Sequence, residues 1–102
     1  MVNNTLVVTG GTRGIGKEIV KNFLKKNFKV FYIYKSKPLK STEFKRYQNS
    51  LFGFKVNLEN PQDTYKFVNY IKKKTKKIDL LINNAGDVLM RANFISSEDK
   101  LW

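Results

Sequence analysis

The stretch from Thr9 to Gly16, TGGTRGIG, places four glycines within eight residues. It follows a β-branched and apolar run, Thr5–Thr9, which is typical of a strand buried on both faces of a parallel sheet. The apolar residues after it have the spacing of one helical face, at Ile15, Ile19, Val20, Phe23 and Leu24. The pattern predicts strand, glycine turn and helix, an arrangement that directs backbone N–H groups at the helix start toward a phosphate.

The next part of the chain continues this alternation. Asn27 fits a left-handed residue at the end of the first helix, and KVFYIY at Lys29–Tyr34 predicts a second buried strand. Residues 35–50 are polar and weakly patterned, and we expect one short helix within Thr42–Gln48. Two further strands are predicted, at Phe52–Leu58 and Ile78–Asn83.

A second long helix is predicted to begin at Asn60-Pro61, with asparagine as N-cap and proline in the first turn. Its buried face is expected to consist of Thr64, Phe67, Val68 and Ile71. Strands that alternate with helices at this pitch predict an α/β fold, a doubly wound parallel sheet, formed by one domain over residues 1–102.

The composition excludes several kinds of chemistry. The chain contains no cysteine and no histidine, so we expect no disulfide, no metal site and no histidine base. The N-terminus lacks the basic and long apolar segments of a signal peptide, and no later window has the length of a membrane span. We therefore expect a cytoplasmic protein that has no membrane partner.

The net charge of +12 raises the alternative of a nucleic-acid-binding protein, with Lys72–Lys77 as its contact. Most of the excess is lysine, whereas recognition of bases and phosphates favours the arginine fork. The lysines are also scattered over the expected polar faces of helices. We favour a solvated lysine-rich surface, and steeply salt-dependent binding to duplex DNA would support the alternative.

Two motifs together resemble those of one enzyme family. TGGTRGIG resembles the TGxxxGIG signature of the classical short-chain dehydrogenases/reductases, and Asn83-Asn84-Ala85-Gly86 matches their NNAG signature after the fourth strand. The resemblance covers essentially the whole chain and implies a Rossmann-type sheet of order 3-2-1-4, truncated after the fourth strand. Met90-Arg91 and the helix start at Ser96–Asp99 are most similar to 3-oxoacyl-(acyl-carrier-protein) reductases.

The resemblance also implies a set of cofactor-binding residues. Those around the phosphates and the adenosine ribose are Gly10, Gly11, Thr12, Arg13, Gly14, Ile15 and Gly16. Those at the adenine are Asn57 and Leu58, and those on the nicotinamide side are Asn84 and Gly86. Ile15 would contribute its backbone N–H to the pyrophosphate. Structural hydrogen bonds that tie the strand to its neighbours are an equal alternative for Asn83 and Asn84.

The charge after the second strand favours NADP over NAD. An NAD site places a carboxylate about twenty residues beyond the glycine turn, where it accepts from the ribose 2′-hydroxyl. Here that position reads Tyr34-Lys35-Ser36-Lys37, which offers a cation and no acid. Lys35 and Arg13 would pair with a 2′-phosphate. A solvated loop lysine is an equal alternative for Lys35.

No catalytic residue is assigned. The family uses a serine and a Tyr-x-x-x-Lys pair located after NNAG, but residues 87–102 contain no tyrosine. The literal match at Tyr70–Lys74 precedes NNAG, on a helix expected to pack outside the sheet, and we reject it. We therefore expect the N-terminal half of an NADP-dependent reductase, inactive alone. The alternatives are a free-standing nucleotide-binding module and one half of a split enzyme whose second chain supplies the C-terminal half.

Overall fold

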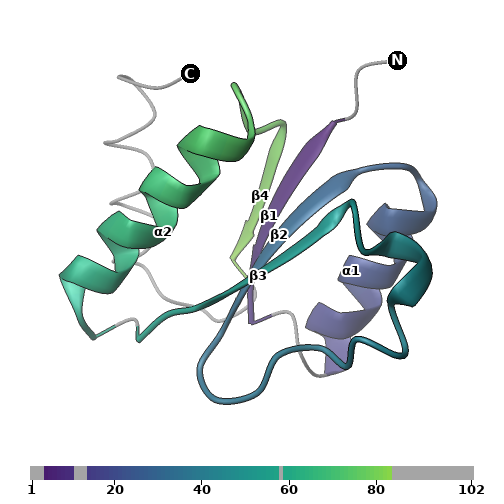
Figure 1. Ribbon diagram of the computed structural model, residues 1–102, viewed down its shortest axis with the longest axis horizontal. Coiled ribbons are helices and arrows are strands. Elements are labelled where there is room, and N and C mark those ends of the chain that lie inside the picture. The colour runs from purple at the N-terminus through teal and green to yellow at the C-terminus, as the bar shows by residue number, and fades with distance from the viewer. Residues whose placement is uncertain (1–3, 11–13, 58, 84–102) are drawn as a thin grey trace.

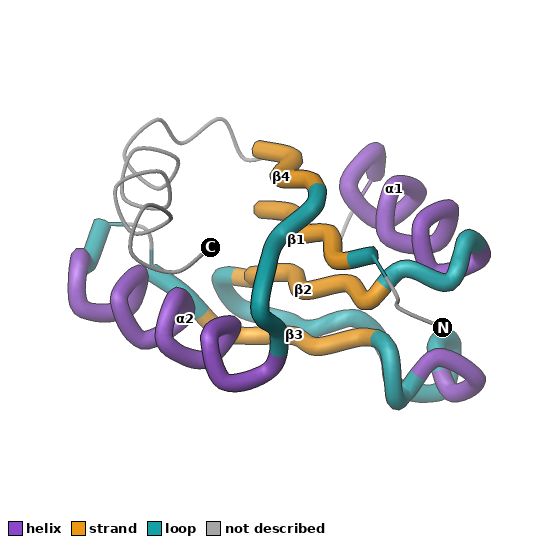
Figure 2. The backbone as a smooth tube through the Cα atoms, turned by 90° about the horizontal axis from the view of Figure 1, so that it is seen from above, coloured by secondary structure: helices purple, strands orange, loops and turns teal. Residues whose placement is uncertain are grey.

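The structure, a computed structural model, describes residues 4–10, 14–57 and 59–83. A four-stranded parallel sheet in the order β3-β2-β1-β4 lies at its centre. The strands are β1 (Thr5–Thr9), β2 (Lys29–Tyr34), β3 (Leu51–Lys55) and β4 (Leu80–Asn83). The α-helices are α1 (Gly14–Lys25) and α2 (Pro61–Lys74), one on each face of the sheet (Figures 1 and 2). The predicted doubly wound sheet and its strand order are confirmed.

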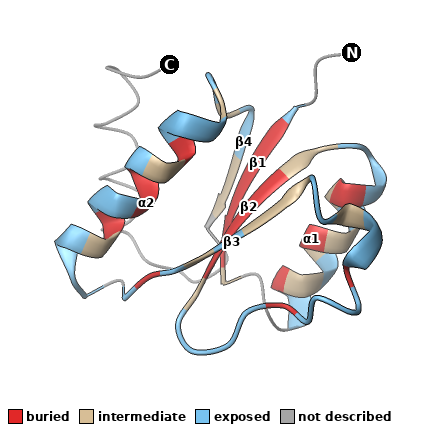
Figure 3. Cartoon of the chain, viewed as in Figure 1, coloured by how far each residue is buried: buried red, intermediate tan, exposed pale blue. Residues whose placement is uncertain are grey.

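Each face of the sheet has its own apolar core because side chains alternate along a strand. Val7 and Phe31 point toward α2, whereas Leu6 and Val8 point toward α1. Figure 3 shows buried residues along the central strands and on the inner sides of both helices. The helix residues that complete the two cores are Val20 and Leu24 of α1, and Phe67, Val68 and Ile71 of α2. The buried face predicted for the second long helix is thus confirmed.

Both helix ends expected from the sequence are present. Asn27 has a φ of 66°, and Phe28 N–H donates to the carbonyl of Phe23 at 3.0 Å, which ends α1 in a Schellman-type turn. At the start of α2, the side chain of Asn60 accepts from the backbone N–H of Gln62 at 3.0 Å. In the described part of the chain, neither α-helix is long and apolar enough to cross a membrane.

Two strand boundaries differ from the prediction because side chains redirect the backbone. β3 ends at Lys55, and two residues later the Asn57 N–H donates to the Asp63 carboxylate at 2.9 Å, which turns the chain toward α2. β4 begins at Leu80, directly after Asp79, whose carboxylate accepts from the backbone N–H of Thr5 at 2.7 Å. Ile78 lies outside the strand and packs against the α2-side core.

The short helix expected within Thr42–Gln48 is present as a 3-10 helix at Lys45–Tyr47. One expectation about α1 was wrong. Ile15 was placed on the buried face of α1, but it is 74% exposed. The buried stripe of α1 is formed by Gly16, Val20 and Leu24, so Ile15 lies beside this stripe, in the first turn of the helix.

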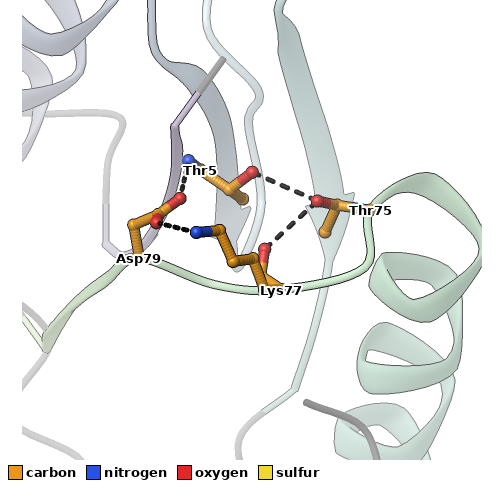
Figure 4. A network of polar contacts seen from close by, with 4 residues as sticks. All are labelled: Thr5, Thr75, Lys77 and Asp79. Carbon is orange, nitrogen blue, oxygen red and sulfur yellow. Dashed lines mark hydrogen bonds and ion pairs between the residues drawn. The ribbon is translucent and has the colours of Figure 1, made fainter. Parts of the chain in front are cut away.

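Polar contacts join the start of β1 to the connection between α2 and β4 (Figure 4). The Asp79 carboxylate accepts from the backbone N–H of Thr5 at 2.7 Å and pairs with Lys77 at 3.3 Å. The hydroxyls of Thr5 and Thr75 lie 3.2 Å apart. The hydrogen bond from Thr5, with a smaller contribution from Lys77, holds the pKa of the Asp79 carboxyl below its usual range.

Replacing Asp79 by alanine is expected to reduce the free energy of unfolding by about 1–3 kcal/mol, because the N–H of the buried Thr5 loses its acceptor. Since the folded-state pKa is lowered, the wild-type contribution is complete at neutral pH. This stabilisation by Asp79 is lost as the pH falls below about 4, the usual pKa of an aspartate, and then through the lowered pKa of the folded state. Urea unfolding at pH 7 and pH 3 measures both effects.

Lys77→Ala is the control for this prediction, because it removes only the ion pair of a side chain that is 63% exposed. We expect this variant to unfold at nearly the wild-type urea concentration. Equal effects of Asp79→Ala and Lys77→Ala at pH 7 would show that the Thr5 hydrogen bond contributes nothing.

Candidate dinucleotide-binding site

The two glycines at the ends of the connection between β1 and α1 have backbone angles that suit a phosphate cradle. Gly10 and Gly14 have φ values of 67° and 54°, in the left-handed region that favours glycine. A Cβ added at Gly14 would meet no atom within 4 Å, so the space beside this residue is open. The first turn of α1 contains no acidic residue, and its N–H groups and positive dipole end favour an anion.

The two sequence motifs begin side by side in the sheet. Thr9, at the end of β1, is in register with Asn83, at the end of β4. The glycine turn follows Thr9 and the remainder of the NNAG motif follows Asn83, so both motifs start from the carboxyl edge of the parallel sheet. Doubly wound folds bind their ligands at this edge.

A basic pocket of about 420 Å³ lies beyond the carboxyl end of β2. Lys17 of α1 forms part of its wall, and the rest comes from the connection between β2 and β3. The complete set of lining residues is Lys17, Lys35, Ser36, Lys37, Pro38, Leu39, Lys40 and Glu43. Glu43 is the one carboxylate in this set. The pocket therefore combines several cations with a hydroxyl, a donor set that suits a phosphate.

The Glu43 carboxylate is shared between two lysines of α1. Its Oε1 lies 2.9 Å from Lys17 Nζ, and its Oε2 lies 3.0 Å from Lys21 Nζ. Hydrogen bonds from these lysines, that from Lys17 first, hold the pKa of the Glu43 carboxyl below its usual range. The carboxylate is thus ionised at neutral pH, and it compensates positive charge at the α1 side of the pocket.

Apolar anchors hold the β2–β3 connection against α1. The side chains of Leu39 and Phe44 are buried in the α1-side core, at 9% and 4% exposure. The Leu39 backbone N–H donates to the Tyr32 hydroxyl at 3.1 Å. Burial raises the pKa of the Tyr32 phenol, so at neutral pH this group is an uncharged acceptor.

Asn57 is exposed and follows β3 at the carboxyl edge of the sheet. Its Oδ1 accepts from the backbone N–H of Glu59 at 3.0 Å, and its own N–H is bonded to Asp63. The side-chain carbonyl is therefore used by the turn, which leaves the Nδ2 amide as the group that can donate to a ligand.

The structure agrees with the rejection of Tyr70-x-x-x-Lys74 as a catalytic pair, because Tyr70 packs against a face of the sheet. The Tyr70 ring contacts Phe31 and Phe54, with ring centroids 6.1 and 5.1 Å apart. Burial raises the pKa of the Tyr70 phenol, the opposite of what acid/base work at neutral pH requires. The Lys74 carbonyl accepts from the Nζ of Lys29, the first residue of β2, so this end of α2 lies at the amino edge of the sheet.

The residues predicted from the sequence are only partly within the described chain. Gly10 and Gly14 have left-handed backbone angles at the two ends of the β1–α1 connection, and Gly16 is buried in the stripe of α1 that faces the sheet. Lys35 lines the pocket, and Asn57 lies at the carboxyl edge of the sheet. The predicted residues outside the described part are Gly11, Thr12, Arg13, Leu58, Asn84 and Gly86. Sequence reasoning missed Lys17, Lys40 and Glu43. Of these three residues, only Lys17 could have been found from the sequence, because it directly follows the glycine motif.

Comparisons with known proteins agree with this geometry. Residues 4–102 match the family model for short chain dehydrogenases. A curated relative, the 3-oxoacyl-(acyl-carrier-protein) reductase FabG of Buchnera aphidicola, is 39% identical over 88 residues, which are 80% of this chain and 34% of the relative. This match confirms the predicted similarity to reductases of that type.

Two solved structures are similar to the fold. A SCOR enzyme from Clostridium thermocellum has a TM-score of 0.71 and 36% identity, over 84% of this chain and 35% of the other. An actinorhodin polyketide ketoreductase with NADPH has a TM-score of 0.69 and 25% identity, over 83% and 34%. The chain thus spans about a third of the length of these relatives. By its motifs, its sheet and the family model, this chain belongs to the short-chain dehydrogenase family.

Proposed function

We propose that this chain binds NADP(H) at the carboxyl edge of its sheet, as the cofactor-binding part of a reductase that transfers hydride to a carbonyl. The observation that carries the proposal is the lysine-lined pocket beyond β2. A site for NAD would place a free carboxylate here, whereas the one acid among the lining residues is paired with Lys17 and Lys21. The ketoreductase structure with NADPH supports the same cofactor class.

The glycine turn and the lysine-lined pocket would bind different parts of the cofactor. Gly10 and Gly14 shape the turn so that the first N–H groups of α1 reach the pyrophosphate, with Gly11, Thr12 and Arg13 around the phosphates and ribose. Lys35 pairs with the 2′-phosphate. The proposed contacts at the two ends of the cofactor are Asn57 and Leu58 with adenine, and Asn84 and Gly86 with the nicotinamide side.

The bound cofactor would supply the hydride, but these 102 residues do not supply the remaining chemistry. After Gly86 there is no tyrosine, so the acid/base pair of the family has no counterpart in residues 87–102. We propose that the chain by itself binds the dinucleotide without turning it over. The catalytic groups would come from further residues of a longer protein or from a partner chain.

The test is a fluorescence titration with NADPH and NADH. We expect NADPH to bind at least about tenfold more tightly, a difference of about 1.4 kcal/mol, because only NADPH has the 2′-phosphate. Added salt should weaken NADPH binding more than NADH binding, since Lys35, Lys37 and Lys40 are exposed. Equal or reversed affinities would refute the NADP assignment.

Lys35→Gln sharpens this titration, because it should weaken NADPH binding and leave NADH binding unchanged. Lys25→Gln is the matched control. It removes the same charge from the last turn of α1 and does not line the pocket. If both variants lose NADPH affinity equally, the effect is one of net charge and Lys35 has no specific role.

A further inference from the structure

Glu43 is the one acidic residue in the wall of a pocket lined by four lysines. Of its two lysine partners, Lys17 also lines the pocket, whereas Lys21 does not. The Glu43 carboxylate therefore bonds on one side to a cation of the pocket, and on the other to a cation outside it. A phosphate that enters the pocket meets both Lys17 and the carboxylate that already holds Lys17.

The β2–β3 connection has anchors that do not depend on Glu43. Leu39 and Phe44 are buried against α1, and the Leu39 N–H is bonded to the Tyr32 hydroxyl. Figure 1 shows this connection passing beside α1 on its way to β3. By contrast, the Glu43 side chain and its two lysine partners are each about a third exposed, at 31%, 31% and 34%. Exposed ion pairs contribute little to holding a loop in place.

We propose that Glu43 is an internal counter-anion of the 2′-phosphate subsite. In the absence of cofactor its carboxylate compensates the charge of the lysines, and it lowers the affinity of the subsite for the phosphate. On binding of the phosphorylated dinucleotide, the Nζ of Lys17 would exchange the Glu43 carboxylate for the 2′-phosphate. The ion pair between Glu43 and Lys21 would remain. Lys17 is thereby a further specificity-determining residue, and Glu43 sets the affinity for the phosphorylated cofactor below what the lysines alone would give. This inference rests on the proposed NADP(H) binding and deepens it.

The direction of the effect follows from charge. A phosphate dianion attracts Lys17 more strongly than a single carboxylate does, so the exchange of partners is favourable. The carboxylate nevertheless stays close to the dianion, because its second oxygen remains bonded to Lys21. Like charges repel, and their repulsion lowers the affinity. If Glu43 were instead a tether that positions the lysines, its removal would lower the affinity.

The test compares Glu43→Gln with the wild type in NADPH and NADH titrations. We expect about three- to tenfold tighter binding of NADPH, the size expected when one charge is removed within several ångströms of a dianion in a water-like dielectric. NADH affinity should stay within twofold of the wild type. Glu18→Gln is the matched control, because it makes the same charge change on the exposed side of α1 and should shift NADPH affinity less.

A double-mutant cycle with Lys17→Gln tests the partner exchange. Lys17→Gln alone should weaken NADPH binding, and in that background Glu43→Gln should give a smaller gain than in the wild type. Unchanged or weaker NADPH binding by Glu43→Gln, with a folded circular dichroism spectrum, overturns the inference. A wild-type chain without NADPH preference overturns the proposed function and the inference together, whereas preference without a gain in Glu43→Gln overturns the inference alone.

Discussion

Replacing Gly14 by asparagine is expected to weaken NADPH binding by at least about tenfold, or about 1.4 kcal/mol, while the chain keeps its fold. Gly14 has a φ of 54°, and asparagine is among the few residues that adopt this conformation readily. The new side chain would extend into the space beside the residue, where a Cβ meets no atom within 4 Å. It would therefore block the approach of a pyrophosphate to the backbone without disturbing the core.

Isothermal titration with NADPH and a thermal melt, performed on the same preparation, test this expectation. Gly14→Ala is a useful second variant, because alanine adds a smaller side chain but greater backbone strain at this φ. If obstruction is the cause, asparagine weakens binding more and alanine destabilises the fold more. NADPH binding by Gly14→Asn at wild-type affinity would mean that the cofactor does not approach this turn.

Replacing Gly53 by alanine is expected to reduce the free energy of unfolding by about 1–3 kcal/mol, the usual effect of overpacking. A Cβ at Gly53 in β3 would lie 2.5 Å from Cζ of Tyr32 in the adjacent strand β2. The ring has little freedom to move away, because Tyr32 is only 4% exposed and its hydroxyl accepts from the N–H of Leu39. Relief of the clash would break this hydrogen bond.

Thermal unfolding measures the effect, at roughly 4–8 °C for each kcal/mol in a domain of this size. Tyr32→Leu provides the control, because the smaller side chain removes the ring that the new methyl group would meet. In this background Gly53→Ala should cost much less than in the wild type, which gives a favourable coupling in the double-mutant cycle. Additive effects would exclude the Tyr32 ring as the source of the strain.

Periodicity and local chemistry predicted most of the fold. The unbroken apolar runs of β1 and β2, the asparagine cap of α2 and the left-handed Asn27 are local signals, and all of them were confirmed. Strand ends were less predictable, because distant side chains decide them. The Asp63 carboxylate accepts from the N–H of Asn57 after β3, and the Asp79 carboxylate, directly before β4, accepts from the N–H of Thr5.

Residues of the candidate site could be predicted only where they lie next to a recognisable sequence pattern. The glycine turn and Lys35 were found from their positions after buried strands. Lys17 and Glu43 are 26 residues apart in the sequence, and no spacing rule joins a helix lysine to a glutamate of a weakly patterned connection. Their meeting depends on the burial of Leu39 and Phe44, which is a tertiary property.

For the NADP(H) binding that we propose, the anchored β2–β3 connection lowers the conformational entropy that is lost on binding. Because Leu39 and Phe44 are packed into the core of the cofactor-free chain, the conformational entropy of this connection is lost on folding and not on binding. A preorganised pocket converts more of its charge attraction into affinity than a loop that must first become ordered. The same packing would make the proposed preference for NADP(H) a property of the folded core as well as of its surface lysines.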